Sequence, residues 1–147
     1  MKIKVLLILF AAVFLLTHFV WAADEIFSFS IEEAMNDPKI QGALLEDIEL
    51  YWGRQAHPPV VRKYGEYKAT KRTNALGKSK EAACRWALAT SLKVLQTRAR
   101  KEGGNAVVNI RSNIYNNEKS SVAEFDCLAG RVIVNASIKG DVVKLKK

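Results

Sequence analysis

Three consecutive residues, Gly77, Lys78 and Ser79, match the second half of a phosphate-binding P-loop. A complete P-loop carries another glycine five positions before the Gly-Lys-Ser, where the backbone must turn its N–H groups toward the phosphates, and that position holds Arg72. The loop should also follow a buried apolar strand, whereas the residues before this one are Lys-Ala-Thr-Lys-Arg. We therefore predict that Gly77 and Lys78 form a turn and that Ser79 caps a helix, with no nucleotide bound.

A second candidate for chemistry is His57, which precedes Pro58 and Pro59. A catalytic histidine needs a nucleophile and an orienting acid, and the sequence points to neither. We expect a solvated loop histidine. The sequence also offers few soft ligands for a transition metal, so we predict neither a metal site nor a cofactor.

Basic residues are concentrated between positions 62 and 80. They are Arg62, Lys63, Lys68, Lys71, Arg72, Lys78 and Lys80, opposed within that stretch only by Glu66. Residues 23–50 are acidic, with eight carboxylates against Lys39. The basic stretch predicts a face for an anionic partner, such as lipid headgroups, lipopolysaccharide phosphates or an acidic polymer. The alternatives are neutralisation by the acidic segment, or lysines that guard an exposed strand edge.

The first 22 residues have the pattern of a secretory signal peptide. Lys2 and Lys4 precede an apolar run over residues 5–16, and Val20 and Ala22 occupy the −3 and −1 positions of a cleavage site. We predict cleavage after Ala22, export to the periplasm or medium, and a single domain over residues 23–147. The alternative is an uncleaved N-terminal anchor. A lipid anchor is not expected, because no cysteine lies near the cleavage site.

The predicted export bears on the state of the two cysteines outside the signal peptide, Cys84 and Cys127. An even pair in an oxidising compartment indicates a disulfide. The bridge would close a loop of about 44 residues and contribute up to about 4 kcal/mol. Two free buried cysteines or a metal-binding pair are the alternatives.

Capping residues and apolar periodicity predict the elements that position these groups. Ser30 and Glu33 form a capping box for a short helix that Pro38 interrupts. A long helix is predicted over residues 79–101, ended by Gly103. Strands or extended segments are predicted over residues 47–52, 60–73, 106–115, 122–128 and 132–138, with a short edge strand at 142–145.

These elements predict an α+β fold. We expect the long helix to pack on an antiparallel sheet, built from a meander of three C-terminal strands and one or two N-terminal strands. Val108, Ile110, Ser112 and Ile114 should share one side of the pleat. The disulfide would then join the helix to the second strand of the meander.

The run from Thr73, "TNALGKSKEAACRWALATSLKVLQTRARKEGGNAVVNI", and the later "EFDCLAGRVIVNASIKGDVV" resemble a family of small exported bacterial proteins that are labelled "excinuclease ATPase subunit". The label implies DNA repair, which an exported chain with an incomplete P-loop contradicts, so we do not carry that activity over. The helix followed by "GGNAVVNI" and a cysteine-bearing strand is more distantly similar to the outer-membrane stress sensor RcsF and related envelope domains. That likeness implies a disulfide-linked binding or sensing module.

The sequence therefore predicts an exported, non-catalytic envelope binding or stress-related accessory module. The candidate partners are an anionic envelope component or another envelope protein, and nucleic acid is not expected. Two other functions are open: an enzyme whose catalytic groups are not recognisable, or a structural homo-oligomer. A long apolar edge strand would favour the oligomer, and a basic surface would favour the binding module.

Overall fold

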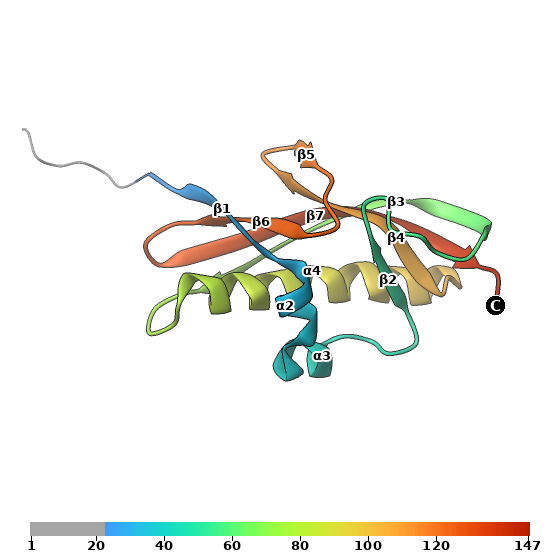
Figure 1. The fold of residues 1–147 in the computed structure, drawn as a ribbon, viewed down its shortest axis with the longest axis horizontal. Coiled ribbons are helices and arrows are strands. Elements are labelled where there is room, and N and C mark those ends of the chain that lie inside the picture. The colour runs from blue at the N-terminus through green and yellow to red at the C-terminus, as the bar shows by residue number, and fades with distance from the viewer. Residues whose placement is uncertain (1–22) are drawn as a thin grey trace, which may run out of the picture.

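The computed structural model describes residues 23–147. The predicted signal peptide, residues 1–22, lies outside the described residues. The described chain is α+β, with one long helix lying along one face of a sheet of seven strands (Figure 1). Its elements in chain order are β1 (Glu25–Ser30), α2 (Ile31–Asn36), α3 (Pro38–Ala43), β2 (Glu49–Trp52), β3 (Val60–Asn74), α4 (Lys80–Glu102), β4 (Ala106–Ile114), β5 (Asn117–Lys119), β6 (Glu124–Ala129) and β7 (Ile133–Leu145).

Helix α4 confirms the capping prediction at both ends. The Ser79 hydroxyl accepts a hydrogen bond from the Ala82 N–H, and Gly103 ends the helix in the left-handed conformation, with φ of 85°. Arg100 and Lys101 lie in the last turn, where the helix dipole favours positive charge. The Gly-Lys-Ser stretch is therefore a turn and a helix cap.

The predicted capping residues of the N-terminal segment also bound its short helices. Ser30 accepts a hydrogen bond from the Glu33 N–H at the start of α2, and Pro38 begins α3 after a break at Asp37. Strand β1, which precedes α2, was not predicted. It pairs antiparallel with β6 from Glu25 to Ser30, so a cross-strand partner far away in sequence gives it its structure.

Strand β7 is the centre of the sheet. It pairs antiparallel with β3 along its whole length on one side, and with β6 and then β4 on the other. The three C-terminal strands are thus ordered β6–β7–β4 rather than in sequence, and β2 joins β4 in parallel, which makes the sheet mixed.

The separate strands predicted at residues 132–138 and 142–145 form one strand, β7, which runs through Gly140. A Cβ at Gly140 would lie 2.6 Å from Val107 Cγ1. Glycine is therefore placed here by close packing against β4 and not by a turn.

A bulge in β4 overturns the predicted alternation. Asn109 has φ of 52°, and the register with β7 shifts between Val108 and Arg111. Val108 consequently packs in a small cluster with Val143 and Tyr51, whereas Ile110 belongs to the main core beneath α4. The two side chains lie on different faces of the sheet.

The predicted disulfide is present and joins Cys84 of α4 to Cys127 of β6, with Cα atoms 5.9 Å apart. Both cysteines are fully buried. The bridge lies in the main core, where α4 leucines and alanines pack on Phe125, Val134, Ala136 and Ile138 of the sheet.

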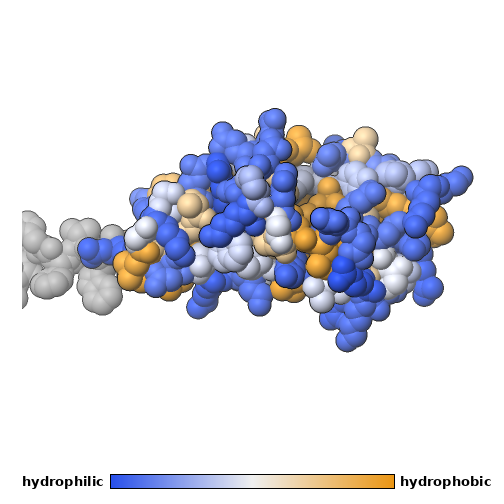
Figure 2. Space-filling view, turned by 90° about the horizontal axis from the view of Figure 1, so that it is seen from below, coloured by the Kyte–Doolittle hydropathy of each residue, from blue (hydrophilic) through white to orange (hydrophobic). Residues whose placement is uncertain are grey.

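The α4 side of the molecule is mainly hydrophilic at its surface, with hydrophobic side chains in smaller separate areas (Figure 2). No helix among residues 23–147 combines the length and the apolar character needed to cross a bilayer. The sheet face opposite α4, which we call the outer face, is crossed by the hairpin of β4 and β5 (Figure 1).

Candidate functional site

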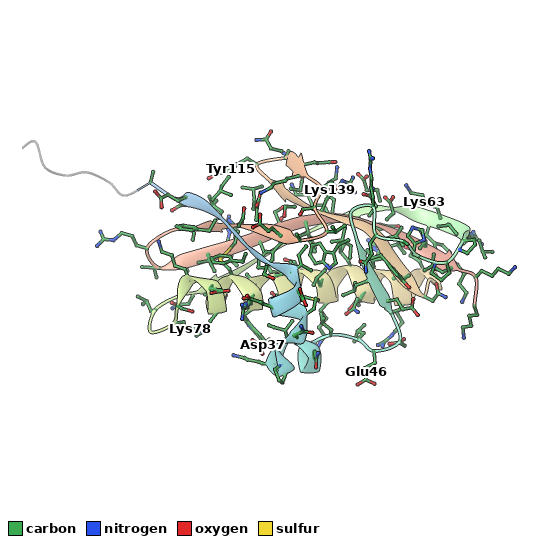
Figure 3. The ribbon with its side chains drawn as sticks, viewed as in Figure 1. Asp37, Glu46, Lys63, Lys78, Tyr115 and Lys139 are labelled. Atoms are coloured by element: carbon green, nitrogen blue, oxygen red, sulfur yellow. A yellow bond between two sulfur atoms is a disulfide. The ribbon has the colours of Figure 1, made fainter. Side chains whose placement is uncertain are left out.

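The seven predicted basic residues follow one edge of the sheet. Arg62, Lys63, Lys68, Lys71 and Arg72 lie on β3, which pairs only with β7 among the described strands. Lys78 lies in the turn before α4, and Lys80 is the first residue of that helix. Lys63 and Lys78 lie toward opposite ends of the long axis of the molecule (Figure 3). We call the seven residues the basic stripe, because they extend along an edge and do not form a compact patch.

The register divides the stripe between the two faces of the sheet. Thr70 donates a hydrogen bond to Ser137 across β3 and β7, at 2.8 Å, and Lys68 and Arg72 share its side of the strand. Lys71 points the other way and borders a groove with Thr90, Lys93 and other residues of α4. The strand edge thus carries positive charge on both sides.

Most charges in the stripe have no acidic partner. Lys63 pairs with Asp141 at 3.2 Å, and among residues 23–147 this is the one ion pair that any member of the stripe makes. Lys68 instead donates to the Asn116 side-chain oxygen at 2.7 Å, and Lys80 lies 4.7 Å from the centre of the Phe27 ring. These contacts position the cations without cancelling their charge.

No carboxylate of residues 23–50 forms an ion pair with the stripe among the described residues. Glu33 pairs with Arg85, and Asp47 pairs with Arg100; both arginines belong to α4. Of the two alternatives from the sequence, a facing arrangement of the acidic and basic segments is thus not made by ion pairs among the described residues, although Asp24 and Arg72 line the same hollow. The other alternative, that the lysines lie on an exposed strand edge, describes the location of β3 correctly and is compatible with binding.

The centre of the outer face holds an ion network that the sequence did not reveal. Arg111, only 7% exposed, donates to Glu118 at 2.7 Å and to Glu66 at 2.5 Å. Lys139 lies 2.5 Å from Glu118 and 2.9 Å from Glu66. Two cations and two carboxylates from β3, β4, β5 and β7 thus form a balanced cluster. Since the four residues come from separate strands, only the strand register brings them together.

The pKa of Glu118 falls from its ordinary 4.5 to about 2, because Arg111 and then Lys139 donate hydrogen bonds to the carboxylate. A lowered pKa means that the charged carboxylate is favoured by folding. Its stabilisation is therefore complete above pH 4.5 and is lost as the pH falls toward 2. We expect the melting temperature to drop over this window.

A matched variant isolates that effect. Glu118→Gln removes the titrating group, so its melting temperature should depend less on pH between 4.5 and 2 than that of the wild type, as measured by circular dichroism. Glu124→Gln is the control, because that exposed carboxylate forms no ion pair within the described chain. Identical pH profiles for Glu118→Gln and the wild type would contradict the assignment.

A hollow of about 540 Å³ lies at one end of the outer face. Its polar lining comes from Asp24, Arg72, Tyr115, Arg131 and Asn135. Sequence reasoning identified Arg72 but missed the others, since they come from the N-terminal segment, two turns and β7. The only signal for Arg131 was its position in the turn between β6 and β7.

His57, the other candidate for chemistry in the sequence, lies in an exposed loop. Its Nδ1 lies 2.8 Å from the Pro58 carbonyl oxygen, with the ring packed edge-on against Tyr51. Within residues 23–147, no three histidine, cysteine, aspartate or glutamate side chains come close enough to hold a metal ion. The charged residues of the stripe and the hollow are the candidates for binding.

In comparisons with known proteins, no protein-family model, no curated protein and no solved structure matches the chain.

Proposed function

We propose that the protein is an exported, non-catalytic binding module whose basic stripe contacts an anionic component of the cell envelope. The observation that carries the proposal is the edge strand β3, on which positive charges project to both sides and only Lys63 has an ion-pair partner among the described residues. Export rests on the signal-peptide pattern of residues 1–22 and accords with the buried disulfide. The resemblance to envelope sensor domains supports the same setting.

The chemistry of the stripe favours a surface as its partner. Exposed lysines and arginines attract an anionic lipid surface by about 1 kcal/mol each, without demanding a fixed geometry. A line of such residues along a strand of 15 residues can contact many phosphates at once. The charged strand also disfavours a homo-oligomer, because antiparallel pairing of two β3 edges about Thr70 would place Lys68 opposite Arg72.

Flotation with vesicles tests the proposal. We expect residues 23–147 to float with phosphatidylglycerol vesicles and not with phosphatidylcholine vesicles, and binding should weaken at high salt. The triple variant Lys68→Gln, Lys71→Gln, Lys78→Gln should bind about a hundredfold more weakly, at about 1 kcal/mol per charge.

The control variant removes the same number of charges elsewhere. Arg54→Gln, Lys101→Gln, Lys146→Gln changes exposed residues outside the stripe. Its binding should fall much less than that of the stripe variant. Equal binding to both lipids, or equal losses in the two variants, would overturn the proposal.

A further inference from the structure

The hollow at the end of the outer face differs from the rest of that face in its charge. In the centre, Arg111 and Lys139 are balanced by Glu66 and Glu118. In the hollow, neither Arg72 nor Arg131 has a carboxylate oxygen within ion-pair distance among the described residues. Two guanidinium groups without an ion-pair partner in residues 23–147 therefore line one cavity, together with a single carboxylate, Asp24.

The strand register builds the floor of this hollow. Arg72 lies directly opposite Asn135 of β7, and Asn135 lies directly opposite Leu128 of β6. Paired residues project to the same face, so these three side chains form a row across β3, β7 and β6. This row lies on the outer face, because the next residue of β6, Cys127, is bonded to α4 on the opposite face. Arg72 thus lies beside the side-chain amide of Asn135, which can donate or accept a hydrogen bond, and near the apolar side chain of Leu128.

Apolar groups complete the cavity. Val132 and Ile133 line it and are 43% and 47% exposed, and Tyr115 is 68% exposed. Tyr115 lies on the side of the sheet away from α4 (Figure 3). Cavities that combine a few converging polar groups with an apolar lining are typical of small-molecule sites.

Tyr115 has a backbone conformation that a tyrosine rarely adopts. Tyr115 and Asn116 form the two-residue turn between β4 and β5, and both have positive φ, of 52° and 63°. Asparagine and glycine adopt this conformation readily, whereas a bulky residue does so at a cost. A strained aromatic residue at the rim of a cationic hollow is the kind of outlier that indicates a binding role.

The one acidic group in the lining is Asp24. A Cβ built on Gly130 would lie 2.5 Å from an Asp24 carboxylate oxygen, so this carboxylate lies against the turn that carries Arg131. It reduces the positive charge of the hollow but does not cancel both arginines. Its removal should therefore strengthen the binding of an anion.

We propose that the hollow binds a small phosphate monoester that carries an aromatic or short apolar group. The guanidinium groups of Arg72 and Arg131 would contact the phosphate, for which their planar arrays of donors are suited. Asn135 would add a hydrogen bond, and the organic group would pack on Tyr115 and Ile133. This site is separate from the membrane contact proposed above and shares only Arg72 with the basic stripe.

Titration of residues 23–147 with phenyl phosphate tests the proposal. Binding is measured by calorimetry and by the shifts of amide signals in NMR spectra. We expect saturable binding with shifts that cluster around residues 72, 115 and 131, and weaker binding of inorganic phosphate. Benzyl alcohol, which lacks the charge, should not bind. Absence of saturable binding, or shifts spread evenly along β3, would overturn the proposal.

Single substitutions separate the site from its surroundings. Arg131→Gln and Arg72→Gln should each weaken phenyl phosphate binding about tenfold or more, and Asp24→Asn should strengthen it. Tyr115→Asn should weaken phenyl phosphate but not inorganic phosphate, and should leave the melting temperature unchanged or higher. Full retention of affinity in both arginine variants would overturn the assignment.

A lysine variant of the stripe keeps this result distinct from the flotation result. The double variant Lys71→Gln, Lys78→Gln retains the Lys68 hydrogen bond to Asn116 beside Tyr115, and it should bind phenyl phosphate as the wild type does while its flotation is weakened. Vesicles that contain phosphatidic acid, whose headgroup is a phosphate monoester, form a second arm. If Arg131→Gln weakens flotation on phosphatidic acid but not phenyl phosphate binding, the ligand is a lipid headgroup and the small-molecule assignment is overturned.

Discussion

Removal of the Cys84–Cys127 disulfide is expected to lower the free energy of unfolding by about 4 kcal/mol. The bridge spans 43 positions in sequence and joins the first turns of α4 to β6. Without it the unfolded chain gains the entropy of an open loop of that length. Because both cysteines are fully buried in the main core, the folded protein loses packing as well.

The double variant Cys84→Ala, Cys127→Ala provides the measurement, with urea unfolding followed by tryptophan fluorescence. Alanine is preferred to serine, because a serine hydroxyl at these positions would be buried without a sure partner. The matched control is the wild-type protein unfolded with and without a reductant. A loss below about 1 kcal/mol would show that the bridge contributes little beyond the packing of its side chains.

Replacement of Gln96 is expected to produce the second large loss, about 3 kcal/mol, since about 1 kcal/mol accompanies each of three hydrogen bonds. Gln96 is 1% exposed, and its side chain bonds to the segment between α3 and β2. Its side-chain oxygen accepts from the Leu45 N–H at 2.8 Å. Its amide nitrogen donates to the carbonyl oxygens of Leu45 and Ile48 at 2.9 Å and 2.7 Å.

Two substitutions separate the hydrogen bonds from the packing. Gln96→Met keeps most of the volume and removes all three bonds, whereas Gln96→Ala also leaves a cavity and should cost more. Thr97→Ala on the exposed side of α4 should change the free energy of unfolding by less than about 1 kcal/mol. Hydrogen exchange at Leu45 should become faster in both Gln96 variants. Unchanged exchange would show that the segment is held by other contacts.

The local elements were predictable because their signals lie within a few residues of each other. Ser79 and Gly103 bound α4 through capping bonds that any chain with those residues forms, and Ser30 and Pro38 act in the same way around α2 and α3. The disulfide was predictable for a different reason: a chain predicted to be exported contains two cysteines, and two cysteines have only one way to pair within the molecule. Neither inference needs knowledge of how the sheet is ordered.

The predictions that were wrong or missing concern residues whose structure depends on strands far away in sequence. Gly140 is a residue type that is common in turns, but here its lack of a side chain lets Val107 of the neighbouring strand approach the β7 backbone. Asn109 gives no local sign of the bulge that moves Val108 and Ile110 to different faces. Strand β1 carries only a short alternation of phenylalanine and serine over residues 27–30, and its antiparallel pairing with β6 makes it a strand.

The candidate sites divide in the same way. The sequence alone determined that the chain would carry a cluster of positive charges over residues 62–80, because composition and charge do not depend on folding. Only the tertiary structure decided that these charges lie along an edge strand, that Arg111 and Lys139 are neutralised, and that Arg131 and Tyr115 join Arg72 around one hollow. The physical reason is that a site is made by side chains from strands and turns far apart in sequence, and the pairing register that brings them together is set by the packing of the whole sheet against α4.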